Sequence, residues 1–341
     1  MKITAHKVWA KAPCRVDLAG GTLDIWPLYL FHRGAVTVNF AVNRYASCTV
    51  EVRRDARIVL RSLDLDGEES FPSLRALAAA ARYRLPIPAL LVRYFAPTVG
   101  LTITTHSEAP AGAGISGSSA LMIALTSALH RLHVAPRLPL ETIRVLAQNV
   151  EAQVIRVPTG CQDYYPALYG GVSAIELTEA GIFRKPLAVD LDDLNERIVL
   201  AYTGAPRQSG INNWQVMKAH IDGDRAVRRN FDHIAGIAAG MRGAVERGDW
   251  KEIARLLREE WANRRKNAPG ISTPLIDRLI QVTRKAGATG AKVCGAGGGG
   301  CVFFLVEHGA RERVAAAIRR EGGQVLPIRV APRGVQVRAE A

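Results

Sequence analysis

Glycine fills five of the six positions from 295 to 300, and this run is the strongest constraint on how the 341-residue chain can fold. Glycine loses more backbone entropy on ordering than any other residue, and a simple hairpin needs only one or two glycines. The run therefore predicts a backbone that lies against something bulky, such as a nucleotide phosphate or another glycine-rich loop. A flexible loop is the alternative. The segments on both sides, 291–294 and 301–306, are typical of strands.

A second glycine-rich stretch, residues 110–121, reads PAGAGISGSSAL and follows a strand-like segment at 101–105. A helix predicted over Ser119–His133 begins within it. Glycines let a backbone approach a ligand closely, and the free N–H groups at a helix start favour an anion. The hydroxyls of Ser118 and Ser119 can hold a phosphate oxygen or Mg²⁺. We therefore predict a phosphate cradle, although the lysine of a P-loop is absent. A small-residue turn that lets the helix pack tightly is the alternative.

Two further stretches place charged residues in or beside turns. Residues 158–171 read PTGCQDYYPALYGG, where Asp163 is either a surface acid or a base for a hydroxyl group. Residues 12–24 read APCRVDLAGGTLD, a strand that runs into a Gly-Gly turn followed by Asp24. Arg15 in that strand is either an exposed charge or a cation near Asp163. Glu151, on a helix predicted over 140–155, is a candidate Mg²⁺ carboxylate.

The order of the predicted elements indicates the fold class. Alternating patterns predict strands at 35–42, 47–52 and 57–62, the first two separated around Asn43-Arg44. After a strand at 197–202, we predict helices at 223–247, 250–265, 273–287 and 309–321, and a last strand near 324–330. This order predicts an α+β fold and argues against a doubly wound Rossmann sheet. We place one domain at 1–195 and a second at 196–341.

Composition excludes several classes of protein. Hydrophobic residues at 48% and charged residues at 22% are ordinary for a globular chain. The longest segment without Asp, Glu, Lys or Arg, residues 109–130, is too interrupted to span a bilayer, and the N-terminus has no apolar signal region. We therefore expect a cytoplasmic protein without a membrane partner. The five cysteines include no Cys-x-x-Cys and predict buried, reduced thiols. The net charge of +14 is scattered, which fits an anionic small molecule better than nucleic acid.

Taken together, these stretches resemble the GHMP kinase superfamily, which includes galactokinase, homoserine kinase and mevalonate kinase. Its three motifs correspond in order to residues 12–24, 110–121 and 292–302. Within the superfamily the chain resembles sugar-1-kinases of the D-glycero-D-manno-heptose 7-phosphate kinase type, and next the kinase half of L-fucokinase. Galactokinases have Gly-Glu-His-Thr-Asp where this chain has Gly20–Asp24, which disfavours galactose. The heptokinase type usually has Gly-Gly-Gly-Thr-Asp there, so Thr22-Leu23 leaves the sugar open.

The resemblance implies a ribosomal-S5-like N-terminal domain and a ferredoxin-like C-terminal domain, with ATP and substrate between them. It implies Asp163 as the catalytic base, Arg15 beside it, and Ser118 and Glu151 as Mg²⁺ ligands. The implied ATP-binding residues are Pro110, Gly112, Ala113, Gly114, Ser116, Gly117, Ser118, Ser119, Gly297 and Gly298. The implied substrate-binding residues are Gly20, Gly21, Thr22, Asp24, Gln162 and Gly298, with Arg207 and Lys218 as candidates for meeting a substrate phosphate.

The implied activity is transfer of the γ-phosphoryl group of ATP to a sugar hydroxyl, with ATP and Mg²⁺ as cofactors. By resemblance the hydroxyl is the anomeric one of a heptose 7-phosphate or a related sugar. A neutral sugar such as fucose or another hexose, and a mevalonate-pathway substrate, are the alternatives. A silent ATP- and sugar-binding regulator is an alternative of another class, and the presence of Asp163 and Ser118 argues against it. We expect a monomer or a homodimer.

Overall fold

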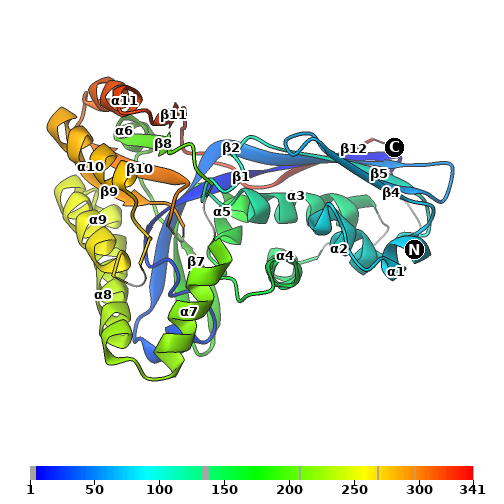
Figure 1. Cartoon of the computed structure of the whole chain (residues 1–341), viewed down its shortest axis with the longest axis horizontal. Coiled ribbons are helices and arrows are strands. Elements are labelled where there is room, and N and C mark those ends of the chain that lie inside the picture. The colour runs from blue at the N-terminus through cyan, green and yellow to red at the C-terminus, as the bar shows by residue number, and fades with distance from the viewer. Residues whose placement is uncertain (1–4, 133–137, 207–208, 267–268, 296, 341) are drawn as a thin grey trace.

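The larger of two β-sheets forms the body of the first half of the chain (Figure 1). The computed structural model describes residues 5–132, 138–206, 209–266, 269–295 and 297–340. The eight strands of this sheet are β1 (Lys7–Ala19), β2 (Val36–Val52), β3 (Ile58–Ser62), β4 (Gly67–Phe71), β5 (Leu101–Ser107), β6 (Val172–Thr178), β7 (Gly181–Pro186) and β12 (Gln336–Glu340). The order is β12-β1-β2-β5-β3-β4, and β6 with β7 extends from the first half of β2. Only the β3–β5 pair is parallel among the described strands.

Helices cover one face of this sheet. They are α1 (Leu74–Ala79), α2 (Pro86–Phe95), α3 (Gly117–Leu132), α4 (Leu140–Ile155) and α5 (Tyr164–Tyr169). The short helix η1 (Leu28–Phe31) lies against β6 and α7, and α6 (Leu191–Glu196) lies beside the second sheet (Figure 1). Helix α3 is buried almost all round and packs along β1 and β2 (Figure 1). A helix that is apolar on every side belongs in a core. Its first turn is thereby held rigidly at the end of β5. The predicted end of this helix at His133 lies outside the described residues.

The second sheet has four antiparallel strands in the order β11-β8-β10-β9. They are β8 (Ile198–Tyr202), β9 (Ala288–Val293), β10 (Cys301–Val306) and β11 (Gln324–Leu326). The helices of this half are α7 (Ser209–Ile221), α8 (Arg225–Arg247), α9 (Trp250–Arg264), α10 (Pro274–Ala286) and α11 (Arg311–Arg320). Strand β10 is buried throughout. Its consecutive residues Phe303 and Phe304 point to opposite faces of the sheet and belong to two different hydrophobic clusters. The predicted α+β fold is confirmed.

Side-chain caps explain why the helix ends of the second half were predictable. Asp224, Asp249 and Thr273 each accept a backbone N–H at the start of α8, α9 and α10. Gly248 and Gly287 end α8 and α10 in the left-handed conformation.

The predicted separation of two strands at Asn43-Arg44 is wrong, because β2 is one continuous strand. The pairing with β1 steps from Pro13 opposite Tyr45 to Cys14 opposite Val42, so Asn43 and Arg44 form a bulge. The polar groups of Asn43 in the bulge form hydrogen bonds with the backbone of a residue far along the chain. The Arg329 backbone N–H donates to Asn43 Oδ1 at 2.7 Å, and the Asn43 N–H donates to Arg329 O at 2.9 Å.

The C-terminal segment returns to the first sheet. The strand predicted near 324–330 is shorter than expected and consists of β11. A further strand, β12, was not predicted from the sequence pattern. It pairs antiparallel with β1, from Lys7 opposite Glu340 to Lys11 opposite Gln336. The domain boundary at 195/196 stays a prediction. Strand β12 lies in the second predicted domain by sequence, but it joins the sheet of the first half of the chain. All five cysteines are buried thiols outside any disulfide, as predicted. In the described part of the chain, no helix has both the length and the apolar character for crossing a bilayer.

Candidate active site

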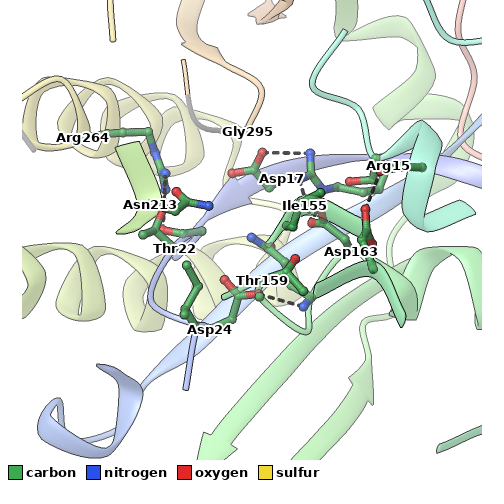
Figure 2. A pocket seen from close by; sticks show the side chains of 17 residues that line it. Arg15, Asp17, Thr22, Asp24, Ile155, Thr159, Asp163, Asn213, Arg264 and Gly295 are labelled. Carbon is green, nitrogen blue, oxygen red and sulfur yellow. Dashed lines mark hydrogen bonds and ion pairs between the residues drawn. The ribbon is translucent and has the colours of Figure 1, made fainter. Parts of the chain in front are cut away.

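A single cleft gathers residues from all four of the predicted stretches (Figure 2). It lies where the turn after β1, the start of α3, the end of α4 and the segment before α5 meet α7, α9 and the glycine run at 295–300. The lining residues are Arg15, Asp17, Gly21, Thr22, Asp24, Ile25, Ser116, Ser118, Glu151, Ile155, Thr159, Gly160, Gln162, Asp163, Asn213, Arg264 and Gly295.

Arg15 and Asp163 form an ion pair at the centre of the cleft, so the predicted proximity of these two residues is confirmed. Arg15 Nε and Nη2 both donate to Asp163 Oδ1, at 2.8 and 2.7 Å. Arg15 Nη1 donates to the Gly114 carbonyl at 2.9 Å, and the guanidinium is buried. Burial alone would lower the pKa of this guanidinium, but the carboxylates of Asp163 and Asp17 raise it by a larger amount. The pKa therefore lies above its usual value, and Arg15 is charged. One cation thus ties the acid to the glycine-rich stretch.

The glycine-rich stretch before α3, residues 110–117, is the predicted phosphate-binding loop and is called the phosphate loop below. Gly112, Gly114 and Ser116 have φ values of 68°, 81° and 62°. For the serine this left-handed conformation is uncommon, and such outliers concentrate at ligand sites. Ser116 Oγ is buried without a hydrogen-bond partner at the cleft. The first N–H groups of α3 lie next to it and have no acceptor within the helix.

The glycine run lies against the phosphate loop, so the flexible-loop alternative is wrong. A Cβ on Gly300 would be 2.7 Å from the Ala113 carbonyl oxygen, and the Cys301 N–H donates to that same oxygen at 2.7 Å. The Gly298 N–H donates to the Ile271 carbonyl at 2.8 Å, which fixes the middle of the run. At Gly299 and Gly300 backbone therefore packs on backbone with no room for a Cβ. Gly295 lines the cleft, whereas Gly297 and Gly298 do not.

Glu151 lies at the cleft under three hydroxyl donors. Ser118 Oγ donates to Oε1 at 2.5 Å, and Ser119 Oγ and Tyr164 Oη donate to Oε2 at 2.9 and 2.5 Å. Burial raises the pKa of the Glu151 carboxyl, and the Ser118 and Tyr164 hydroxyls oppose that shift. Among the described residues no group of three or more His, Cys, Asp or Glu side chains suits a metal ion. One carboxylate with a nearby hydroxyl still fits Mg²⁺, which takes oxygen ligands and fills its shell with phosphate and water.

Asp24 is buried within the turn that follows β1, residues 20–25, which is called the acceptor turn below because its residues are the predicted ligands of the phosphoryl acceptor. Its Oδ2 accepts the Gln162 N–H at 2.8 Å. Burial and the nearby charge of Asp163 raise the pKa of Asp24 to about 6. The turn rests on a small hydrophobic cluster that includes Leu23 and Ile25. Asp24 is thereby fixed with its carboxyl group toward the cleft (Figure 2).

A buried chain of charges behind the cleft was missed by the sequence reasoning. Lys292 in β9 pairs with Asp17 in β1 and lies 3.4 Å from Glu260 in α9. Glu260 also pairs with Arg264, which reaches the acceptor turn. Burial opposes ionisation of Asp17, yet Lys292 and Arg15 lower its pKa well below the usual value. Lone charges in otherwise apolar segments, such as Lys292, were the available signal.

The predicted substrate residues Gly21, Thr22, Asp24 and Gln162 meet in the cleft, while Gly20, the first residue of the turn, is buried and does not line the cleft. Of the predicted ATP-binding residues, Ser116 and Ser118 line the cleft. The others in the phosphate loop and first turn of α3 lie beside it: Pro110, Gly112, Ala113, Gly114, Gly117 and Ser119. Arg207 lies outside the described residues. Lys218 is exposed and pairs with Asp222, away from the cleft lining. Asn213, Arg264 and Gly295 are cleft residues that were not predicted.

Comparison with known families finds two matches in the order of the chain. Residues 76–171 match the GHMP kinases N terminal domain, and residues 241–324 match the GHMP kinases C terminal domain. Both matches lie within segments that contribute to the cleft, since the first contains the phosphate loop with Asp163 and the second contains Arg264 with the glycine run.

Three curated relatives share sequence similarity over much of the chain. A D-glycero-alpha-D-manno-heptose 7-phosphate kinase of Campylobacter jejuni is 26% identical over 96% of this chain and 97% of that protein. A mevalonate kinase of Thermococcus onnurineus is 30% identical over 70% of this chain and 69% of that protein. An L-fucokinase/L-fucose-1-P guanylyltransferase of Bacteroides fragilis is 25% identical over 88% of this chain, which spans only 34% of that longer protein.

The structure resembles a solved sugar-phosphate kinase. A D-glycero-D-manno-heptose 1-phosphate kinase from Bacteroides thetaiotaomicron has a TM-score of 0.78 and 26% identity, covering 98% of this chain and 99% of that chain. These similarities confirm the resemblance that the three motifs predicted.

Proposed function

The chain belongs to the GHMP kinase family, and from this premise we propose that it transfers the γ-phosphoryl group of ATP to a hydroxyl group of a sugar. The proposed acceptor is the anomeric hydroxyl of a heptose 7-phosphate or a related sugar. The observation that carries the proposal is the Arg15–Asp163 pair, which joins an acid in the cleft to the phosphate loop through the Gly114 carbonyl. Phosphoryl transfer requires a proton acceptor beside a phosphate-binding backbone, and this arrangement supports those roles for Asp163 and the phosphate loop.

The geometry supports a division of labour in this transfer. The phosphate loop and the first turn of α3 would bind the phosphates of ATP through backbone N–H groups. Ser118 and Glu151 would hold Mg²⁺, which when bound neutralises phosphate charge. Both Arg15 bonds end on Asp163 Oδ1, which leaves Oδ2 to orient the acceptor hydroxyl and take its proton. Arg15 would also stabilise negative charge that develops during transfer.

The cleft suits a polyhydroxylated acceptor. Within its described lining only Ile25 and Ile155 have hydrocarbon side chains. Gln162 Oε1 is buried without a hydrogen-bond partner, and Asp24, Thr22 and Asn213 present further polar atoms. A buried acceptor atom without a donor is costly, so a ligand hydroxyl there would be favoured. These features favour a sugar over mevalonate.

A neutral sugar is the second candidate, and the charges of the cleft favour it. Both arginines of the described lining already have a carboxylate partner, Arg15 with Asp163 and Arg264 with Glu260. The lining also contains the carboxylates of Asp17, Asp24 and Glu151. A substrate phosphate would therefore need a further cation, for which Arg207 remains the candidate.

One panel of reactions tests the proposal and separates the two candidates. Heptose 7-phosphates, neutral heptoses and hexoses including fucose, mevalonate and homoserine are each incubated with ATP and Mg²⁺, and ³¹P NMR identifies the phosphorylated hydroxyl. We expect an anomeric phosphate on a sugar, abolished in Asp163→Asn. A preference for mevalonate or homoserine, or no transfer to any acceptor, would contradict the proposal.

A further inference from the structure

The acceptor turn has a strained backbone at Thr22. Thr22 has a φ of 74°, in the left-handed region that a β-branched residue rarely adopts. Gly20, two residues earlier, has a φ of 85° without that penalty. A strained residue persists only where its surroundings over-determine it, and such residues concentrate at ligand sites. Something in the structure must therefore hold Thr22 in place.

Arg264, the last residue of α9, makes the contacts that hold the turn (Figure 2). Its Nη2 donates to the Gly21 carbonyl at 2.8 Å and its Nη1 donates to Thr22 Oγ1 at 3.3 Å. Both bonds end on the residues at the strained position. The guanidinium thus bonds both the peptide and the side chain around the unusual φ.

The guanidinium itself has a fixed orientation. Arg264 Nε donates to Glu260 Oε1 at 2.8 Å, and Lys292 lies 3.4 Å from the same oxygen. The side chain is only 3% exposed, so few other rotamers are open to it. Burial lowers the pKa of Arg264, but Glu260 and Asp17 raise it overall, so the group remains a charged donor.

The shape of the turn also depends on glycine at position 21. A Cβ there would lie 2.9 Å from Gln162 Nε2 and 3.1 Å from Arg264 Nη2. The Arg264 guanidinium and the Gln162 amide therefore occupy the space beside the turn that a side chain at this position would need. Arg264, Asn213 and Gly295 come from the second half of the chain, and the other residues that line the site come from the first half.

We propose that Arg264 is a positioning residue that holds the acceptor turn in its strained conformation and so sets the affinity for the phosphoryl acceptor. This inference rests on the proposed function only for the identity of that ligand. Without the guanidinium, Thr22 relaxes toward negative φ and the turn that carries Asp24 shifts. The phosphate loop keeps its geometry, since the hydrogen bonds of Arg264 in the described part of the chain go to Glu260, Gly21 and Thr22.

The test compares Arg264→Met and Arg264→Lys with Arg144→Met. Arg144 is a matched control, since it is also buried and paired, with Glu141 and Gln148, but lies outside the cleft lining. The readout without substrate is hydrogen exchange at the Leu23 and Ile25 amides, which donate to Gly20 O and Thr22 O, both at 3.2 Å. The readouts with substrate are KM for the acceptor and KM for ATP.

We expect Arg264→Met to speed exchange at both amides and to raise acceptor KM about tenfold or more, the loss of one charged hydrogen bond, with KM for ATP unchanged. Arg264→Lys should give a smaller effect, and Arg144→Met should lower Tm without moving either readout. If Arg264→Met does not fold, the charge-balanced pair Glu260→Gln with Arg264→Met replaces it.

A glycine at position 22 separates positioning from direct binding. Glycine adopts a φ of 74° without strain, so Arg264→Met should raise acceptor KM by a smaller factor in a Thr22→Gly background. If Arg264→Met raises acceptor KM by the same factor in wild type and in the Thr22→Gly background, Arg264 binds the acceptor directly and the inference is overturned. The same conclusion follows if acceptor KM rises while hydrogen exchange at the Leu23 and Ile25 amides is unchanged. Unchanged exchange and unchanged KM would overturn the inference as well. Faster exchange in a protein that phosphorylates no acceptor would support the positioning role and contradict only the proposed function.

Discussion

Replacing Asp24 with asparagine should make the protein more stable at neutral pH while it damages the cleft. The Asp24 carboxyl is buried, and a Cβ on Gly160 would lie 2.0 Å from its Oδ2, so the backbone there covers the group closely. Its hydrogen bond from the Gln162 N–H does not offset the burial and the charge of Asp163, which raise the pKa from 3.8 to about 6. Asparagine can accept the same hydrogen bond without carrying charge.

The sign and size of the effect follow from this shift. Between pH 3.8 and about 6 the folded protein binds a proton that the unfolded chain has released, so the free energy of unfolding falls as pH rises through this range. Each pKa unit corresponds to about 1.4 kcal/mol, so the two-unit shift costs on the order of 3 kcal/mol at pH 7. Asp24→Asn should recover about that amount above pH 7 and nothing below pH 4.

Urea denaturation of wild type and Asp24→Asn from pH 4 to pH 8 measures this difference directly. Asp192→Asn is the control, because the Asp192 side chain is 94% exposed and its removal should give a small difference that does not vary in this way. A constant difference between wild type and Asp24→Asn across the range would refute the reasoning. So would a wild type that is the more stable protein at pH 7.

Four other substitutions test the cleft and the glycine run beside it. Asp163→Asn should lower kcat by about 10²–10⁴-fold while ATP binding by calorimetry stays intact; turnover near that of wild type would remove Asp163 from the mechanism. Ser118→Ala should raise the Mg²⁺ concentration needed for half-maximal rate, and an unchanged titration would mean that Ser119, or neither serine, is the ligand. Gly300→Ala should weaken ATP binding and lower Tm, since its Cβ would be 2.7 Å from the Ala113 oxygen. Gly298→Ala is the control and should lower Tm less, because its Cβ would meet only Gly270 O at 3.4 Å. Equal losses of Tm and ATP affinity in the two variants would contradict this packing argument.

Local pattern and special residues made much of the fold predictable. Helix α4 has the predicted bounds, 140–155, because its apolar residues recur at helical spacing. Strand β10 also has its predicted bounds, 301–306. The glycine run at 295–300 was expected to lie against something bulky, either a nucleotide phosphate or another glycine-rich loop, and the Gly300–Ala113 contact fits the second of these.

What the sequence could not reveal depends on contacts between distant segments. Asparagine is a residue type typical of turns, and the sequence gives no other indication for Asn43. In the structure Asn43 lies in a bulge, where its side chain accepts a hydrogen bond from the backbone of Arg329, far along the chain. Lys292 and Asp17 are individually ordinary, and only the meeting of the two sheets makes them a buried pair. The contact of Arg264 with the acceptor turn likewise needs α9 to be placed against the end of β1. Such pairs leave no periodicity that a single sequence can show.

The pairing of β12 with β1 has a consequence for how the protein is made. A ribosome completes β1, with Arg15 and Asp17, long before it reaches residues 336–340, which hydrogen-bond along the N-terminal end of that strand. Until then β1 has an open edge, and open strand edges pair with other chains. The nascent protein therefore passes through an interval in which its first strand is available to a chaperone or to a neighbouring nascent chain. Arrival of β12 closes that interval and hides the edge.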